Sequence, residues 1–227
     1  MRKTEVIYLV GPMGAGKSTI GKLLADSLNM EFYDVDREIE ERAGVDIPWI
    51  FDMEGEEGFR EREAQMLSDL SDSPGAVVST GGGAVLRDDN RALMMTRGTV
   101  VYLRTSVDEQ IRRTAKDRKR PLLQQGNPEE TLRRLMAERE PLYLQLADYS
   151  ITTDQRSPRT VVQELVEKIR SGDLSSRAAC KCDRSTARYR NARENRVGRF
   201  DAYIISRLPL STNNIGQFHE AASGVAG

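Results

Sequence analysis

Cysteine and histidine are scarce in this sequence, and neither occurs in its first 172 positions. The two cysteines, Cys180 and Cys182, and the single histidine, His219, all lie in the last quarter of the chain. Residues 1–172 therefore need no disulfide and carry no thiolate chemistry. The two cysteines and one distant histidine are also too few to assign a metal site.

Long apolar runs are absent as well. None approaches the ~18–20 residues that a membrane-spanning helix needs. The N-terminal stretch "MRKTEVIYLVG" passes directly into a strand pattern and shows no cleavage site of a signal peptide. We therefore expect a cytoplasmic protein with no membrane partner.

The balance of charge changes sign along the chain. Residues 1–172 contain 25 basic and 30 acidic side chains, a net charge of −5, whereas residues 173–227 contain 9 and 5, a net charge of +4. This change predicts a folded domain over 1–172 and a basic tail over 173–227. The tail has no sustained hydrophobic period, so we expect it to be disordered or non-native, as after a shift of reading frame. A segment attracted to RNA or membranes and a partner-docking element are alternatives for the tail.

Short β-branched runs alternate with helical periodicities in residues 1–172. The strand candidates are "VIYLV", "EFYDVD", "AVVST", "TVVYL" and "YSITT". Five strands separated by helices predict an α/β fold, with a parallel sheet covered by helices on both faces. Capping signals at Ser106 with Glu109, at Asn127 and at Ser157 predict the starts of three of the helices.

The stretch "GPMGAGKSTIG" follows the first strand candidate and contains the Walker A pattern Gly11-x-x-x-x-Gly16-Lys17-Ser18. Its glycines permit positive φ, so that backbone N–H groups converge on phosphate oxygens at the start of a helix. We expect Lys17 to reach the β- and γ-phosphates and the Ser18 hydroxyl to ligate Mg²⁺. A glycine-rich turn without a ligand would not require Lys followed by Ser. The pattern predicts nucleoside triphosphate binding by Gly14, Ala15, Gly16, Lys17, Ser18 and Thr19.

Two aspartates, Asp34 and Asp36, stand at the end of the second strand candidate. Their i, i+2 spacing sends both side chains to the same side of a strand, at the edge where parallel sheets bind ligands. One carboxylate could steady the water shell of Mg²⁺ while the other accepts hydrogen bonds from an acceptor hydroxyl. Capping of the next helix is the alternative.

A glycine triplet, Gly81-Gly82-Gly83, ends the third strand candidate. It is best explained if the backbone approaches a ligand closely and offers bare N–H donors, although a loose turn is an alternative. Two arginines, Arg60 and Arg139, add guanidinium groups that match a carboxylate bidentately. Each could singly be a surface residue. As a set with the glycines they predict a site for a small anion.

A basic stretch, "RRTAKDRKRPLLQQG", spans residues 112–126. A flexible basic segment of this kind could fold over bound triphosphate, exclude water and bring an arginine to the transferring phosphoryl group. A nucleic-acid patch is the alternative. It is disfavoured because the domain is net acidic and has no aromatic platform beside the stretch.

The ordered motifs "GPMGAGKST", "FYDVD", "EGEEGFRERE", "TGGG", "KRPLL" and "EREPLY" resemble those of shikimate kinases, in particular the enterobacterial-type members. The resemblance runs from about residue 6 to about residue 170. It implies a P-loop kinase fold of the nucleoside-monophosphate kinase group, a three-layer α/β/α arrangement whose five-stranded parallel sheet has the order 2-3-1-4-5. It also implies a substrate-binding segment at about 34–62 and a mobile lid at about 113–127.

The same resemblance implies roles for single residues. Shikimate would be bound by Asp36, Arg60, Gly81, Gly82, Gly83 and Arg139. In that set Arg60 and Arg139 would take the carboxylate and Asp36 the ring hydroxyls. On the nucleotide side, Asp34 would contact Mg²⁺ through water, Arg120 would lie on the lid over the phosphates, and Arg113 and Arg156 would lie near the adenine.

The implied reaction is transfer of the γ-phosphoryl group of MgATP to the 3-hydroxyl of shikimate, a step of aromatic amino acid biosynthesis. Lys17, Asp36 and Arg120 would be the catalytic residues, with Asp36 a general base or an orienting group. Small kinases of this design can act as monomers, and we expect no nucleic-acid partner for the folded domain. A kinase of another small hydroxy acid, such as gluconate, and a non-catalytic nucleotide-dependent binding module remain alternatives.

Overall fold

The computed structural model describes residues 6–73, 75–115 and 127–171. The predicted tail over 173–227, Arg120 and most of the predicted lid lie outside these residues. The strands are β1 (Val6–Val10), β2 (Glu31–Asp34), β3 (Ala76–Ser79), β4 (Gly98–Arg104) and β5 (Tyr149–Thr152). The helices are α1 (Lys17–Leu28), α2 (Val35–Ala43), α3 (Ile47–Ser71), the 3₁₀ turn η1 (Ala84–Leu86), α4 (Asp88–Arg97), α5 (Val107–Thr114), α6 (Pro128–Leu146) and α7 (Pro158–Arg170).

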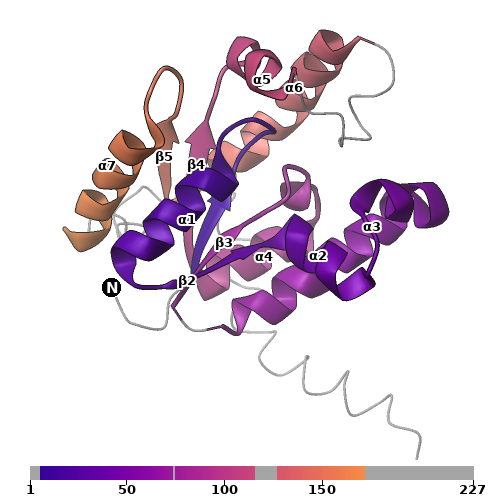
Figure 1. Cartoon of the computed structure of the whole chain (residues 1–227), viewed down its shortest axis with the longest axis horizontal. Coiled ribbons are helices and arrows are strands. Elements are labelled where there is room, and N and C mark those ends of the chain that lie inside the picture. Colours follow the sequence, from indigo (N-terminus) through magenta and orange to yellow (C-terminus); the bar gives the residue numbers. More distant parts are fainter. Residues whose placement is uncertain (1–5, 74, 116–126, 172–227) are drawn as a thin grey trace, which may run out of the picture. The chain divides into compact units, whose positions relative to one another are not determined.

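The five strands form one parallel sheet in the order β2-β3-β1-β4-β5 (Figure 1). This confirms both the predicted α/β fold and the predicted strand order. β1 lies at the centre, and all five of its residues are buried, as is usual for strands covered on both faces. The loop that follows β1 therefore leaves from the middle of the sheet.

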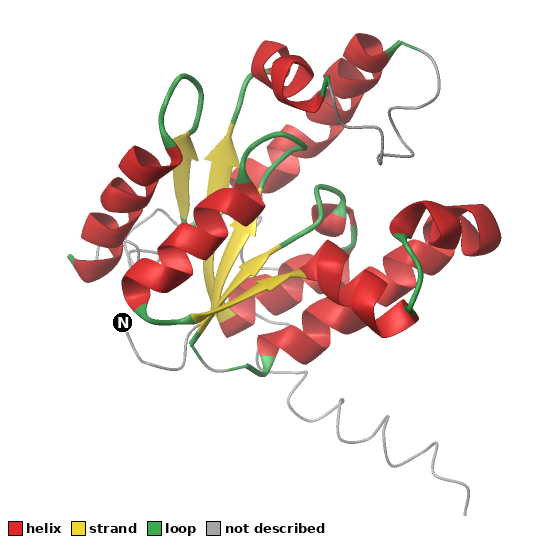
Figure 2. Ribbon diagram, viewed as in Figure 1, coloured by secondary structure: helices red, strands yellow, loops and turns green. Residues whose placement is uncertain are grey.

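Helices cover both faces of the sheet (Figure 2). Side chains that alternate along a strand point to opposite faces, so Ile7 and Leu9 join one core cluster and Tyr8 the other. The first cluster includes buried residues of α1 and α7, which pack together, and the second includes residues of α2, α3, α4 and α6. Within the described residues, no helix is long and apolar enough to cross a membrane.

Three predicted helix starts are confirmed. The side chains of Ser106, Asn127 and Ser157 each accept a hydrogen bond from a backbone N–H in the first turn of α5, α6 and α7, at 3.3, 3.0 and 3.2 Å. These contacts satisfy donors that have no partner inside a helix. The predicted pairing of Ser106 with Glu109 is only half formed, because the Ser106 N–H donates to Asp154 and the carboxylate of Glu109 binds arginines of its own helix.

The prediction that Asp36 lies at a strand end is wrong. β2 ends at Asp34, and Asp36 lies in the first turn of α2. The backbone of Asp34 takes the N-cap position, with φ −110° and ψ 113°, and the chain turns into the helix there. Acidic side chains in a first turn are stabilised by the helix dipole. The capping alternative fails for Asp34 as well, because its side chain accepts no capping hydrogen bond.

Helix α3 is interrupted at Gly55, whose φ of 72° and ψ of −177° are not helical. The Asp46 side chain caps the first part by accepting a 3.1 Å hydrogen bond from the Trp49 N–H. The second part buries an apolar stripe that consists of Phe59, Met66, Leu67 and Leu70. One charged residue, Glu63, is buried in the same face. This packing fixes the helix that carries Arg60.

Candidate active site

The P-loop joins β1 to α1, as the sequence predicts. Gly14 and Gly16 have φ of 76° and 88°, values that favour glycine. Gly16 is the N-cap of α1 and contributes no side-chain cap, so the positive end of this helix faces a loop suited to an anion. The Lys17 ammonium donates to the carbonyls of Gly11 and Pro12 at 2.8 and 2.9 Å, which holds it over the loop.

The Ser18 hydroxyl donates a 2.5 Å hydrogen bond to Oδ2 of Asp34. This pair places a hydroxyl and a carboxylate beside the phosphate loop, which is the oxygen donor set that Mg²⁺ prefers. The described residues hold no cluster of three or more His, Cys, Asp or Glu side chains that could bind a metal alone. A Mg²⁺ ion at this place would therefore share its coordination with phosphate and water.

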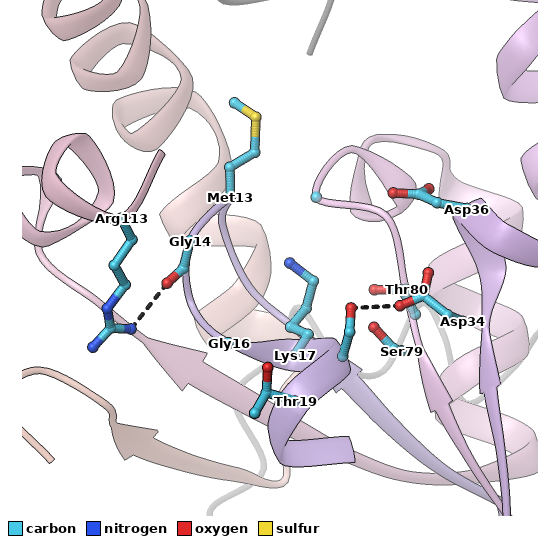
Figure 3. Close-up of a pocket in the computed structure, with 12 residues that line it drawn as sticks. Met13, Gly14, Gly16, Lys17, Thr19, Asp34, Asp36, Ser79, Thr80 and Arg113 are labelled. Atoms are coloured by element: carbon cyan, nitrogen blue, oxygen red, sulfur yellow. Dashed lines mark hydrogen bonds between the residues drawn. The ribbon is translucent and has the colours of Figure 1, made fainter. Parts of the chain in front are cut away.

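A cavity of about 300 Å³ opens over the P-loop (Figure 3). Figure 3 shows the Lys17 side chain between the loop that carries Gly14 and the two aspartates Asp34 and Asp36. Of the predicted site residues, the cavity is lined by Gly14, Gly16, Lys17, Ser18, Thr19, Asp34, Asp36, Gly82 and Arg113. It is also lined by Met13, Ser79 and Thr80, which the sequence reasoning did not single out.

Four other predicted site residues, Arg60, Gly81, Gly83 and Arg139, do not line this cavity. Arg60 lies in a network of charges. Its guanidinium donates to Glu63 Oε2 at 2.8 Å and to Glu56 Oε1 at 3.0 Å. Burial is the largest single influence and would lower the pKa of Arg60, but the carboxylates of Glu63 and Glu56 together outweigh it and the pKa is raised. Arg60 is therefore a fixed positive charge whose side chain is only 12% exposed.

Glu63 is a buried carboxylate that the sequence reasoning missed. Burial raises its pKa, and the positive charges of Arg60 and Arg139 act against that shift. Among the described residues, its Oε1 has no hydrogen-bond partner. The signal for it was present, because position 63 lies four residues from both Phe59 and Leu67 on the apolar stripe of α3.

The glycine triplet follows β3, and close approach explains two of its members. A Cβ atom on Gly81 would clash with Glu63 Oε1 and lie 3.1 Å from Asp36 Oδ1. A Cβ atom on Gly83 would clash with the guanidinium of Arg60. The groups that approach these two glycines are side chains of the protein itself, so the approach of a ligand to the triplet stays a prediction, with the loose turn as its alternative.

Arg139 lies in α6 and is buried, with 6% exposure. A Cβ atom on Gly82 would lie 3.8 Å from its Nη1 atom. The Nε atom of Arg139 is buried and has no hydrogen-bond partner among the described residues. Arg139 and Arg60 thus approach the same glycine triplet from two different helices.

Arg113 ties the P-loop to the segment after β5. Its Nη1 donates to the Gly14 carbonyl at 2.9 Å and to Thr153 Oγ1 at 3.1 Å, and its Nη2 donates to the Thr153 carbonyl at 2.9 Å. Arg156 does not line the cavity, and its guanidinium pairs with Glu164 at 2.7 Å. The structure thus brings Arg113, but not Arg156, to the cavity wall.

Comparisons with known proteins identify the family. A model of the family described as shikimate kinase matches residues 13–170. The shikimate kinase of Chromohalobacter salexigens is 60% identical over 168 residues, which is 74% of this chain and 93% of that protein. The chain belongs to the shikimate kinase family. Another shikimate kinase, from Pseudomonas aeruginosa, is 60% identical over 164 residues, or 72% of this chain and 95% of that protein.

Solved structures of shikimate kinases share the fold. The shikimate kinase from Acinetobacter baumannii in complex with shikimate is 49% identical, with a TM-score of 0.73 over 75% of this chain and 96% of that one. The shikimate kinase from Aquifex aeolicus is 38% identical, with a TM-score of 0.65 over 74% of this chain and 98% of that one. The resemblance seen in the sequence motifs is thereby confirmed. The family match ends at residue 170, before the tail begins.

Proposed function

We propose that this chain transfers the γ-phosphoryl group of ATP to the 3-hydroxyl of shikimate, giving shikimate 3-phosphate and ADP. The observation that carries the proposal is that the P-loop, Asp36 and Gly82 line the same cavity, in a chain of the shikimate kinase family. The relative from A. baumannii was solved in complex with shikimate. The product would feed aromatic amino acid biosynthesis.

The nucleotide side of the site uses the P-loop. Backbone N–H groups of residues 14–19 and the start of α1 would hold the phosphates, and Lys17 would exchange its carbonyl partners for phosphate oxygens. Mg²⁺ would be held directly by Ser18 and through water by Asp34, which already share a hydrogen bond. The ion would neutralise charge on the phosphates. In our proposal Arg113 and Arg156 lie near the adenine.

The acceptor side uses groups that converge on the glycine triplet. Arg60 and Arg139 would bind the shikimate carboxylate, since guanidinium groups pair bidentately with carboxylates. Asp36 would accept hydrogen bonds from the ring hydroxyls, and its Oδ1 lies beside Gly81. Residues 81–83 would offer backbone donors. The segment of about 34–62 would serve as the substrate-binding segment.

The chemistry places few covalent demands on the protein. The 3-hydroxyl oxygen attacks the γ-phosphorus in line, the bond to the bridging oxygen of ADP breaks, and the hydroxyl proton is released. Asp36 orients that hydroxyl and can take its proton. Phosphoryl transfer through a loose transition state depends mainly on positioning and charge neutralisation, which Lys17 and Arg120 would supply. Arg120 would act from a lid over about 113–127.

The test is an ADP-release assay with MgATP and with shikimate, gluconate or no acceptor. Release that depends on shikimate establishes the reaction. Release that depends on gluconate would assign a different acceptor. ADP binding without release for either acceptor would overturn the proposed function and favour a nucleotide-dependent binding module.

Deletion of residues 173–227 tests whether the tail is needed for activity. Among the described residues the last helix is α7, which ends at Arg170, and every proposed site residue precedes that helix. We therefore propose that the shortened chain keeps its shikimate-dependent activity. We also propose that it is a cytoplasmic monomer that binds no nucleic acid. Sedimentation of the shortened chain would report its mass. A salt-dependent affinity for RNA in the full chain alone would assign the tail a separate role.

A further inference from the structure

A tyrosine of α6 forms a hydrogen bond with the backbone of the glycine triplet. The side chain of Tyr143 is fully buried, and its hydroxyl donates a hydrogen bond of 2.5 Å to the carbonyl of Gly82. The two residues are 61 positions apart in the sequence. The ring of Tyr143 stacks on that of Tyr102 from β4, with centroids 5.0 Å apart and planes at 25°. The stacked and buried ring therefore holds the Tyr143 hydroxyl at a fixed position in the core.

This hydrogen bond fixes more than one carbonyl. A peptide unit is planar, so the Gly82 carbonyl and the Gly83 N–H belong to one rigid plane and point in opposite directions. Glycines on both sides of this unit leave it free of the steric limits that hold other peptides in place. Without an anchor, the Gly82–Gly83 peptide could rotate. The Tyr143 hydroxyl holds its carbonyl toward the core and its N–H away from it.

The two residues of the anchored peptide approach both arginines of the proposed acceptor side. A Cβ atom on Gly82 would lie 3.8 Å from Arg139 Nη1 and 3.6 Å from the Gly11 carbonyl oxygen, and a Cβ atom on Gly83 would clash with the Arg60 guanidinium. Arg139 also precedes Tyr143 by one helical turn in α6, and its positive charge lowers the pKa of Tyr143 against the larger effect of burial, which raises it. One helix thus carries both a guanidinium of the acceptor side and the anchor of the backbone beside it.

We propose that Tyr143 is a positioning residue for acceptor binding: its hydroxyl sets the orientation of the Gly82–Gly83 peptide that faces the acceptor. The proposal rests on the proposed function, because it concerns the same acceptor site. Tyr143 contacts neither nucleotide nor the P-loop lysine in this scheme. Its removal should therefore change acceptor binding and leave nucleotide binding unaltered.

The experiment compares two matched variants of the full chain, Tyr143→Phe and Tyr102→Phe. Each removes one buried phenolic oxygen and leaves the stacked rings in place. The Tyr102 hydroxyl has no hydrogen-bond partner among the described residues, so its loss provides the control. Steady-state kinetics give KM for shikimate and for ATP, and amide hydrogen exchange reports on residues 81–84 without ligands.

We expect Tyr143→Phe to raise KM for shikimate about five-fold, the effect of one lost hydrogen bond, with KM for ATP unchanged. Exchange at residues 81–84 should be faster in Tyr143→Phe and unchanged in Tyr102→Phe. Equal effects of the two variants, or a parallel rise in both KM values, would overturn the positioning role. So would a Tyr143→Phe chain that does not fold, because the hydroxyl would then serve the fold. If the chain without substitutions shows no shikimate-dependent turnover, the proposed function is overturned instead. In that case hydrogen exchange at residues 81–84 still decides whether Tyr143 anchors the Gly82–Gly83 peptide.

Discussion

Oε1 of Glu109 accepts a hydrogen bond from Nε of Arg113 at 2.7 Å, one turn further along α5. The same guanidinium donates to the carbonyl of Gly14 in the P-loop. Glu109 therefore orients the arginine that braces the phosphate-binding loop. Hydrogen bonds from Arg112 and Arg113 lower the pKa of Glu109 to about 2.

This shift predicts a pH-dependent contribution of Glu109 to stability. Its pKa falls from 4.5 to about 2 on folding, so the stabilisation is complete above pH 4.5 and is lost as the pH falls toward 2. We expect Glu109→Gln to lower the Tm at pH 7. The difference in Tm between this variant and the chain without substitutions should shrink as the pH falls from 4.5 toward 2. Thermal unfolding at a series of pH values measures this difference. Glu167→Gln, at an exposed position of α7, is the control, and a constant difference at all pH values would contradict the prediction.

Asp36→Ala should abolish turnover and leave ADP binding nearly intact. Asp36 lines the cavity, and in the proposed function it serves the acceptor, whereas the P-loop would supply the phosphate contacts. We expect kcat to fall by at least about 100-fold, the lower range for a group that orients or deprotonates the nucleophile. Glu38→Ala on the same helix, which does not line the cavity, serves as control. A large loss of ADP affinity in calorimetry would show that Asp36 acts on the nucleotide.

Arg139→Lys tests bidentate recognition of the acceptor carboxylate. Lysine keeps the charge but loses the planar fork, so KM for shikimate should rise about ten-fold while KM for ATP stays the same. The matched control is Arg134→Lys, an exposed position on the same helix. If KM for shikimate does not change, Arg139 is not a bidentate ligand.

Gly83→Ala should be more harmful than Gly82→Ala. A methyl group at position 83 would clash with the Arg60 guanidinium, whereas at position 82 the nearest atom would be the Gly11 carbonyl oxygen at 3.6 Å. Displacing the guanidinium would break its hydrogen bonds to Glu63 and Glu56, and the loss of a hydrogen bond to a charged group costs about 1.5–3 kcal/mol. Chemical denaturation should show that loss for Gly83→Ala, together with a raised KM for shikimate. Equal stability of the two variants would mean that Arg60 moves aside freely.

Local patterns in the sequence were sufficient for much of the fold. Strand order was implied by the family motifs, and the helix starts at Ser106, Asn127 and Ser157 depend on neighbours within three residues, which a sequence displays directly. The P-loop is likewise a contiguous motif. The end of β2 was misjudged by two residues because Asp34 and Asp36 fit either an alternating strand or a helical turn.

Contacts between distant segments were not predictable in the same way. The approach of Glu63 to Gly81 and of Tyr143 to Gly82 depends on how α3 and α6 pack on the sheet. No local pattern encodes that packing. A polar residue inside an apolar helical stripe, as at Glu63, is the kind of signal that points to such a contact before a structure is known.

The order of the sheet has a consequence for the engineering of acceptor specificity. β1 and β3 are adjacent and paired in register, from Ile7 with Val77 to Leu9 with Ser79, whereas α2 and α3 form one continuous stretch of chain between β2 and β3. Both ends of that segment are fixed on neighbouring strands, β2 and β3, so it can be exchanged as one unit. Exchange of this segment between relatives would alter the walls around the proposed acceptor site and leave the P-loop attached to β1, as it is in this chain.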